Sequence, residues 1–166
     1  MTAFNGRLVS ALSADRLYRV RLERSEVLFI QVGGQEIGQA IALQFGLLGA
    51  LIYAPLKRKS DARLKARIQD VDAQPMGSQL GAGEHDFRAS ASEIESSTLE
   101  PAAAIGGHGR HFGRWILQLS GRKPMTLQLE SEADMRCALE AIPLAIPLHV
   151  NHAAWDAVRK KFTRTT

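Results

Sequence analysis

The chain has 166 residues, of which 45% are hydrophobic and 23% charged, and its formal net charge is +4. That length fits one domain and buries enough surface to fold without a metal ion, and the single cysteine excludes an intrachain disulfide. The first seven residues lack the layout of a signal peptide, so the sequence predicts a cytoplasmic protein.

The charge is distributed in blocks. Residues 84–100 carry five acids against one base, a local charge of −4, and residues 156–166 carry four bases against one acid, a local +3. Residues 57–67 carry six bases against one acid, a local +5: Lys57, Arg58, Lys59, Arg63, Lys65 and Arg67. These local charges constrain the choice of partner more than the total does.

The first predicted element is a β-hairpin. Tyr18, Val20 and Leu22 alternate with polar residues over residues 17–23, as in a half-buried strand. Residues 27–32 are more continuously apolar and predict a second strand, with Arg24 and Ser25 as the turn. Residues 4–12 are a candidate for one further element.

A helical insertion is predicted next, over about residues 35–74. Within residues 37–56, apolar residues fill two helical faces, and Pro55 is expected to interrupt the helix near its end. After the basic run, Leu64, Ile68 and Val71 are spaced by four and three residues, which predicts a second, amphipathic helix.

The second half of the chain is predicted to return to strands. The candidates are residues 85–89, 93–99, 114–119 and 125–129, with residues 120–124 as a hairpin loop.

Two helices are predicted to follow. Ser131 is placed to cap the first, which should end at Pro143 and Pro147, and Cys137 in its apolar pattern predicts a packed core thiol. Residues 152–162 are predicted to form an appended helix at the C-terminus.

The order of these elements resembles the pleckstrin-homology (PH) superfold, especially its small bacterial members. The residues that carry the resemblance are the hairpin 17–32, the phrase 93–97, the strand pair 114–129 and the helix from Ser131 to Ile142. The resemblance implies an α+β fold in which an antiparallel barrel or sandwich is closed by a C-terminal helix. It also implies a general binding role. The chain departs from the pattern by its helical insertion and by six counted strands where seven are expected.

No motif predicts catalysis. Residues 106–113 contain three glycines at GxGxxxG spacing, but a strand follows them where a phosphate site needs a helix N-terminus. No serine sits in a nucleophile elbow, and Glu93 and Glu95 are expected to share a solvated strand face.

Two histidine pairs have spacing that suits a metal ion, His108 with His111 and His149 with His152. Neither pair has an adjacent carboxylate to orient an imidazole, so solvated loop histidines are the better interpretation. We therefore expect no enzyme, no cofactor and no metal site.

Three interpretations of residues 37–56 remain compatible with the sequence. The segment forms a buried or self-associating helical hairpin, a helix at the membrane surface, or a membrane span. The bases that follow it fit the two membrane interpretations, because cations beside an apolar helix are attracted to anionic head groups, and they equally fit the first as the solvated face of the next helix. The predicted partner-binding residues are Phe45, Leu48, Ile52, Lys57, Arg58, Lys59 and Arg63.

The leading prediction is a non-enzymatic interaction module, cytoplasmic or peripheral at the inner face of the membrane, with a protein partner or a homo-oligomer as further options. The alternative is a basic nucleic-acid-binding protein. Against the alternative, the chain has ten aromatic residues and none lies among the bases of residues 57–67.

Overall fold

The computed structural model describes residues 2–9, 15–34, 46–75, 83–101, 112–150, 153–156 and 161–164. For residues 46–56, 101, 153–156 and 161–164, only the course of the backbone is described.

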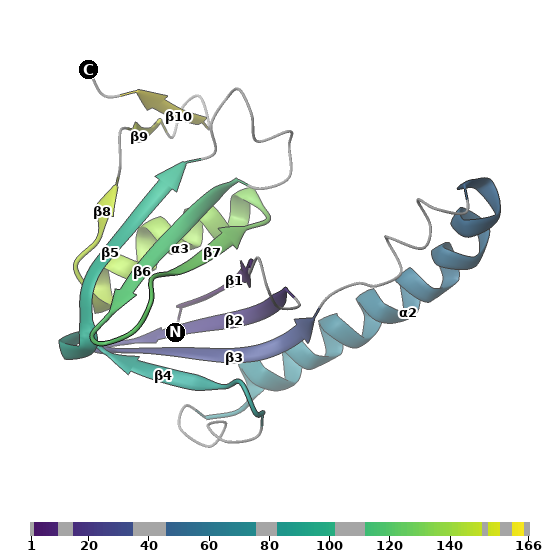
Figure 1. Cartoon of the computed structure of the whole chain (residues 1–166), viewed down its shortest axis with the longest axis horizontal. Helices are drawn as coiled ribbons and strands as arrows, with labels where there is room; N and C mark the ends of the chain where they lie inside the picture. The colour runs from purple at the N-terminus through teal and green to yellow at the C-terminus, as the bar shows by residue number, and fades with distance from the viewer. Residues whose placement is uncertain are drawn as a thin grey trace.

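The fold is α+β, with one open, mixed sheet of eight strands in the order β4-β3-β2-β1-β7-β6-β5-β8 (Figure 1). Neighbouring strands are antiparallel except β5 and β8, which are parallel. The strands are Thr2–Leu8 (β1), Arg16–Glu23 (β2), Glu26–Gly34 (β3), Phe87–Ser90 (β4), Ile94–Pro101 (β5), Gly113–Leu119 (β6), Met125–Leu129 (β7) and His149–Val150 (β8). The six predicted strands are present, and the candidate element near the N-terminus is β1.

The predicted C-terminal helix over residues 152–162 is wrong. The described part of this region forms two antiparallel strands, Ala153–Asp156 (β9) and Lys161–Arg164 (β10), with Phe162 opposite Trp155 in register. Aromatic residues and threonine favour strands, and the helical spacing of Trp155, Val158 and Phe162 did not outweigh this preference.

The helix α3 (Glu132–Ala145) begins where the sequence predicted. The Ser131 side chain accepts a hydrogen bond from the backbone N–H of Asp134 at 3.0 Å, which caps the first turn. The helix ends two residues beyond Pro143, later than predicted, because a proline in the last turn removes only one backbone hydrogen bond. Its buried stripe packs on β1, β2 and β7 and consists of Met135, Ala138, Ala141 and Ile142.

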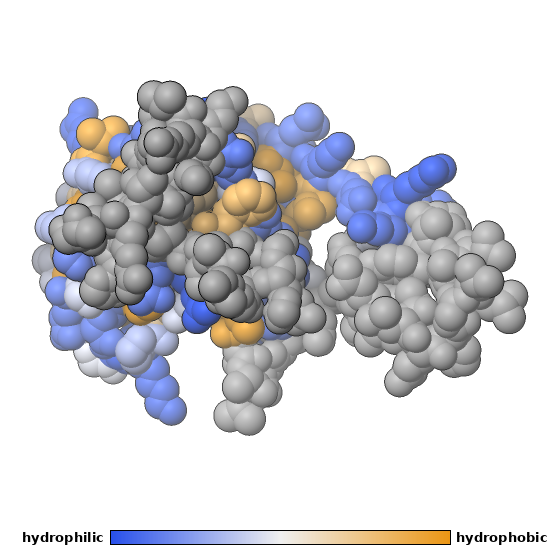
Figure 2. Space-filling model, turned by 90° about the horizontal axis from the view of Figure 1, so that it is seen from above, coloured by the Kyte–Doolittle hydropathy of each residue, from blue (hydrophilic) through white to orange (hydrophobic). Residues whose placement is uncertain are grey.

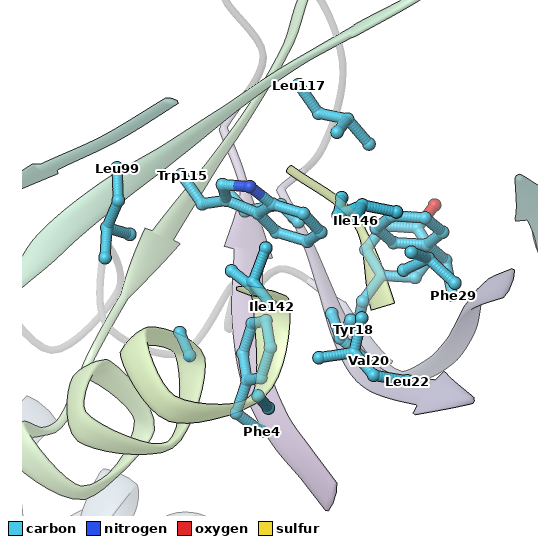
Figure 3. Close-up of a cluster of buried hydrophobic side chains, with 14 of the residues drawn as sticks. Phe4, Tyr18, Val20, Leu22, Phe29, Leu99, Trp115, Leu117, Ile142 and Ile146 are labelled. Carbon is cyan, nitrogen blue, oxygen red and sulfur yellow. The ribbon is translucent and has the colours of Figure 1, made fainter. Parts of the chain in front are cut away.

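Trp115 lies at the centre of the main core (Figure 3). Its ring meets Phe4 of β1 edge-on with centroids 5.7 Å apart, and it stacks on Phe29 of β3 at 5.9 Å. Its indole N–H donates to the buried Ser97 hydroxyl of β5 at 2.9 Å. One side chain on β6 therefore links strands from both halves of the sheet.

The junction between β1 and β7 is short, since these two strands share only two residue pairs, as do β5 and β8 at the edge of the sheet. Beyond those pairs, side chains of α3 bind the backbone of β1. The Asp134 carboxylate accepts from the backbone N–H of Asn5 at 2.7 Å, and the Cys137 thiol donates to the carbonyl of Ala3 at 3.3 Å. Hydrogen bonds from side chains of α3 thus take the place of some strand-to-strand hydrogen bonds, and they hold α3 where β1 meets β7.

The segment between β3 and β4 contains one long helix, α2 (Gly46–Ala73). The predicted break at Pro55 is wrong, since the helix continues across it. A proline removes one backbone donor, and a helix of 28 residues retains the bonds on either side. Residues 46–73, which the prediction divided between two helices, therefore form one continuous helix that extends beyond the sheet (Figure 1).

The C-terminal part of α2 covers the second face of the sheet. Leu17, Leu28, Ile30 and Val71 are buried but lie outside the main core. A Cβ added to Gly33 of β3 would lie 3.5 Å from Leu64, so helix and strand are in close contact there. The predicted stripe of Leu64, Ile68 and Val71 is the docked face of α2.

Candidate functional site

Helix α2 is anchored to the sheet by a bidentate ion pair. The Arg19 guanidinium of β2 donates to the two carboxylate oxygens of Asp72, at 3.0 and 2.7 Å, and also to the side-chain carbonyl of Asn5 at 3.2 Å. The Arg19 side chain is 14% exposed and that of Asp72 is 38% exposed. The two parallel bonds fix direction as well as distance, which a single contact does not.

A second arginine of β2 caps the same helix end. Arg21 is fully buried, and its Nη1 donates to the carbonyls of Val71 at 2.9 Å and Gln74 at 3.1 Å. Burial lowers the pKa of Arg21, while the charges of Asp72 and Glu23 act in the opposite direction. Arginine nevertheless stays cationic in proteins, so it places a positive charge at the negative end of the α2 dipole.

Towards its N-terminus, helix α2 leaves the body of the protein four residues before Leu64, the first residue of the docked stripe. Lys57, Arg58, Lys59 and Ser60 are all exposed. A turn of α-helix takes 3.6 residues, so four exposed neighbours mean that no side of the helix is covered at this point. The helix is therefore docked from Asp61 onward and projects before it.

The bases of this region are available to a partner. The six bases of residues 57–67 are exposed, and none of the salt bridges among the described residues involves them. Hydrophilic side chains crowd the part of α2 that leaves the body (Figure 2). Residues 46–56, which continue the same helix, contain no charged residue. We call residues 46–67 the α2 arm, which comprises the projecting part of the helix and the first docked turns that carry the remaining exposed bases.

The predicted partner-binding residues fall into three groups. The structure places Lys57, Arg58, Lys59 and Arg63 together on the exposed part of the arm. Leu48 and Ile52 lie in the same helix, in the part for which only the backbone is described. Phe45 lies outside the described residues. Within the described residues, no helix is both long enough and apolar enough to cross a bilayer.

A cavity of about 700 Å³ lies where the C-terminal ends of α2 and α3 meet the turn between β2 and β3. Its walls include Leu22, Ala141 and the exposed Leu144, together with Arg21 and Arg24. Glu23 and Asp72 also line it, so charges of both signs face the space. This electrostatic environment favours no single class of ligand.

Shifted pKa values mark no catalytic cluster among the described residues. Burial is the main cause where the pKa of Tyr18 and of Cys137 is raised. Glu93 belongs to a 3-10 turn (η1, Ala91–Glu93) rather than to the predicted strand face, and hydrogen bonds from Ser90 lower its pKa. None of these shifts has a neighbouring titratable group as its main cause, which is the pattern expected of packing and capping.

The histidine pairs and the glycine-rich run, for which no metal or phosphate site is expected, lie largely outside the described residues. Of the two histidine pairs only His149 is described, as an exposed residue of β8, and of the glycine-rich run only Phe112 and Gly113 are described. The described residues contain no group of three or more His, Cys, Asp or Glu side chains that suits a metal ion.

Sequence reasoning missed the anchor. Arg19 and Arg21 alternate with apolar residues and resemble the wet face of an ordinary strand. One signal was available: Asp70 and Asp72 lie at the C-terminal end of a helix, where the dipole disfavours acids. An acid in that position needs a tertiary partner, and Asp72 has one.

Comparison with known proteins gives no match, whether the chain is compared with protein families, with curated proteins or with solved structures.

Proposed function

We propose that the protein is a non-enzymatic, PH-like module that binds anionic membrane surfaces through the α2 arm. The observation that carries this proposal is the fully exposed turn at residues 57–60, which lies between a docked helix end and an uncharged helical segment.

The charge of the arm supports lipid as the partner. A base near an anionic membrane surface contributes about 1 kcal/mol, so three or four of the six bases acting together give about 3–4 kcal/mol. An uncharged helical segment beside such bases adds apolar burial at the headgroup boundary. Electrostatic attraction and apolar insertion are the two signals that stable peripheral attachment requires.

The strand order supports the PH-like part of the proposal. Strands β1 to β7 form the consecutive run β4-β3-β2-β1-β7-β6-β5 within the sheet, and α3 follows β7 after two residues. Seven strands followed by a helix support the element order of the proposed PH-like fold, within a sheet that is open and mixed. The insertion that carries α2 lies between β3 and β4 in the sequence.

Co-sedimentation with phosphatidylserine-containing vesicles tests the function. We expect the wild type to bind at low salt, to be released at high salt, and not to bind phosphatidylcholine vesicles. The triple variant Lys57→Gln, Arg58→Gln, Lys59→Gln should lose most of the binding. The matched control is Arg114→Gln, Arg122→Gln, Lys123→Gln, which removes three exposed charges from β6 and the β6–β7 loop and should bind as the wild type does.

Two results would overturn the proposal. The first is absence of wild-type binding to anionic vesicles at low salt, and the second is equal loss of binding in both triple variants. A labelled DNA duplex and a mass measurement run alongside. Salt-dependent binding to DNA without binding to vesicles would favour the nucleic-acid function, and a dimeric mass that persists in the absence of lipid would favour self-association.

A further inference from the structure

The two aspartates near the C-terminal end of α2 differ in one respect. Asp70 and Asp72 are both exposed to some degree, carry the same charge and lie where the helix dipole disfavours acids. Asp72 has the bidentate pair with Arg19, whereas no salt bridge among the described residues involves Asp70. Both aspartates lie between the α2 arm and the C-terminal end of α2, and each lowers the positive charge of the whole helix by the same amount.

We infer that the Asp72–Arg19 pair is a positioning device that holds the α2 arm as a formed helix at a set direction before it meets its partner. The inference rests on the proposed function. A helix that projects into solvent has no tertiary packing of its own, and isolated helices of its length are marginal in water. The docked end supplies the formed turns from which the projecting part continues, and the Arg19 fork fixes that end.

Preorganisation has a binding consequence. An arm that is already helical loses little conformational entropy when it binds. A released arm must become ordered on contact, and that loss of entropy weakens binding. Loosening the anchor should therefore weaken membrane binding even when the change makes helix α2 more positive. Simple electrostatics predicts the opposite sign.

The test compares Asp72→Asn with Asp70→Asn in the full chain, using phosphatidylserine-containing vesicles. Both variants remove one negative charge from the end of α2. We expect Asp70→Asn to bind as tightly as the wild type or up to about fivefold tighter, since one charge near the membrane is worth about that factor. We expect Asp72→Asn to bind about threefold weaker, the value of a partly exposed ion pair.

Arg19→Lys is the second variant, because it keeps the charge but loses the planar fork that grips both carboxylate oxygens. It should also bind more weakly than the wild type. Equal tightening in Asp72→Asn and Asp70→Asn, with wild-type binding by Arg19→Lys, would overturn the inference and leave the proposed function intact.

Amide hydrogen exchange without vesicles provides a readout that does not depend on the proposed function. Exchange at residues 57–67 should be faster in Asp72→Asn and in Arg19→Lys than in the wild type, and unchanged in Asp70→Asn. The same exchange rates in all four proteins would overturn the inference. Absence of wild-type vesicle binding would overturn the proposed function alone, since exchange would still decide whether the pair holds the arm.

Discussion

The two α-helices in the described part of the chain are held in different ways. Helix α3 has an N-cap, acids in its first turn and a buried stripe of four residues against the sheet. Helix α2 is twice as long, with 28 residues against 14, but among its residues with described side chains only Val71 is buried. Two arginines of β2 hold its end.

Helix α3 is therefore part of the packed core, whereas α2 extends from the body of the protein. Helix α3 closes the main core and binds the backbone of β1, so its position is set by burial along its length. Helix α2 covers the second face of the sheet with its last turns only and then leaves it. The polar anchor holds one end of α2, whereas residues 57–60 farther along the helix are exposed.

The largest expected effect is on the free energy of unfolding, and it is found by replacing one isoleucine on each helix. Ile142 of α3 is fully buried, so Ile142→Ala should lower the free energy of unfolding by about 2–5 kcal/mol. Ile68 of α2 is half-buried, so Ile68→Ala should cost about 1 kcal/mol. Urea unfolding measures both, and equal losses would contradict the division between the two helices.

The cap on α2 is expected to have an intermediate effect. Arg21→Met keeps much of the side-chain volume but removes the donor to the Val71 and Gln74 carbonyls, so we expect a loss of about 1–3 kcal/mol. Arg114→Met on the exposed face of β6 is the matched control and should change stability by less than about 0.5 kcal/mol. If Arg21→Met is as stable as the control, the buried arginine does not hold α2.

The smallest expected effect is on the pH dependence of stability and on thiol reactivity, and it compares Cys137 of α3 with a cysteine introduced into α2. Burial raises the pKa of Cys137 on α3, so the folded state keeps the thiol protonated. Below the ordinary pKa of a thiol, Cys137 adds no dependence of stability on pH. As the pH rises above that value and through the raised folded-state pKa, stability is lost, because the unfolded chain ionises first.

Two measurements check this prediction. Urea unfolding from about pH 7 to about pH 9.5 should show the wild type losing stability relative to Cys137→Ser. At neutral pH, a thiol reagent should modify Cys137 more slowly than a cysteine placed on α2 by Ser60→Cys in the Cys137→Ser background. Equal labelling rates would contradict the contrast in packing.

The sequence predicted most of the architecture because the strands alternate clearly and Ser131 is a strong helix signal. Its errors have local causes. Pro55 and Pro143 were given too much weight as helix terminators, since each removes only one backbone bond. The C-terminal strands were missed because Trp155 and Phe162 also fit a helical spacing.

The candidate site could be predicted only in part. The basic run is visible in the sequence, and its residues do lie together on one exposed helix. That the helix is docked at one end depends on Arg19 and Arg21, which pair with residues about fifty positions away. Long-range pairs of this kind have no local signal, so neither the anchor nor the direction of the arm follows from the pattern.

The central claim is that the projecting part of α2 is the surface that meets the membrane. A polarity-sensitive fluorophore attached to Ser60→Cys, in the Cys137→Ser background, tests it most directly. The same label at Ser120→Cys, in the exposed β6–β7 loop, is the control. We predict a blue shift at residue 60 with phosphatidylserine-containing vesicles, none with phosphatidylcholine vesicles, and none at residue 120 with either. A shift at residue 120 equal to that at residue 60, or no shift at residue 60 while the protein is vesicle-bound, would contradict the claim.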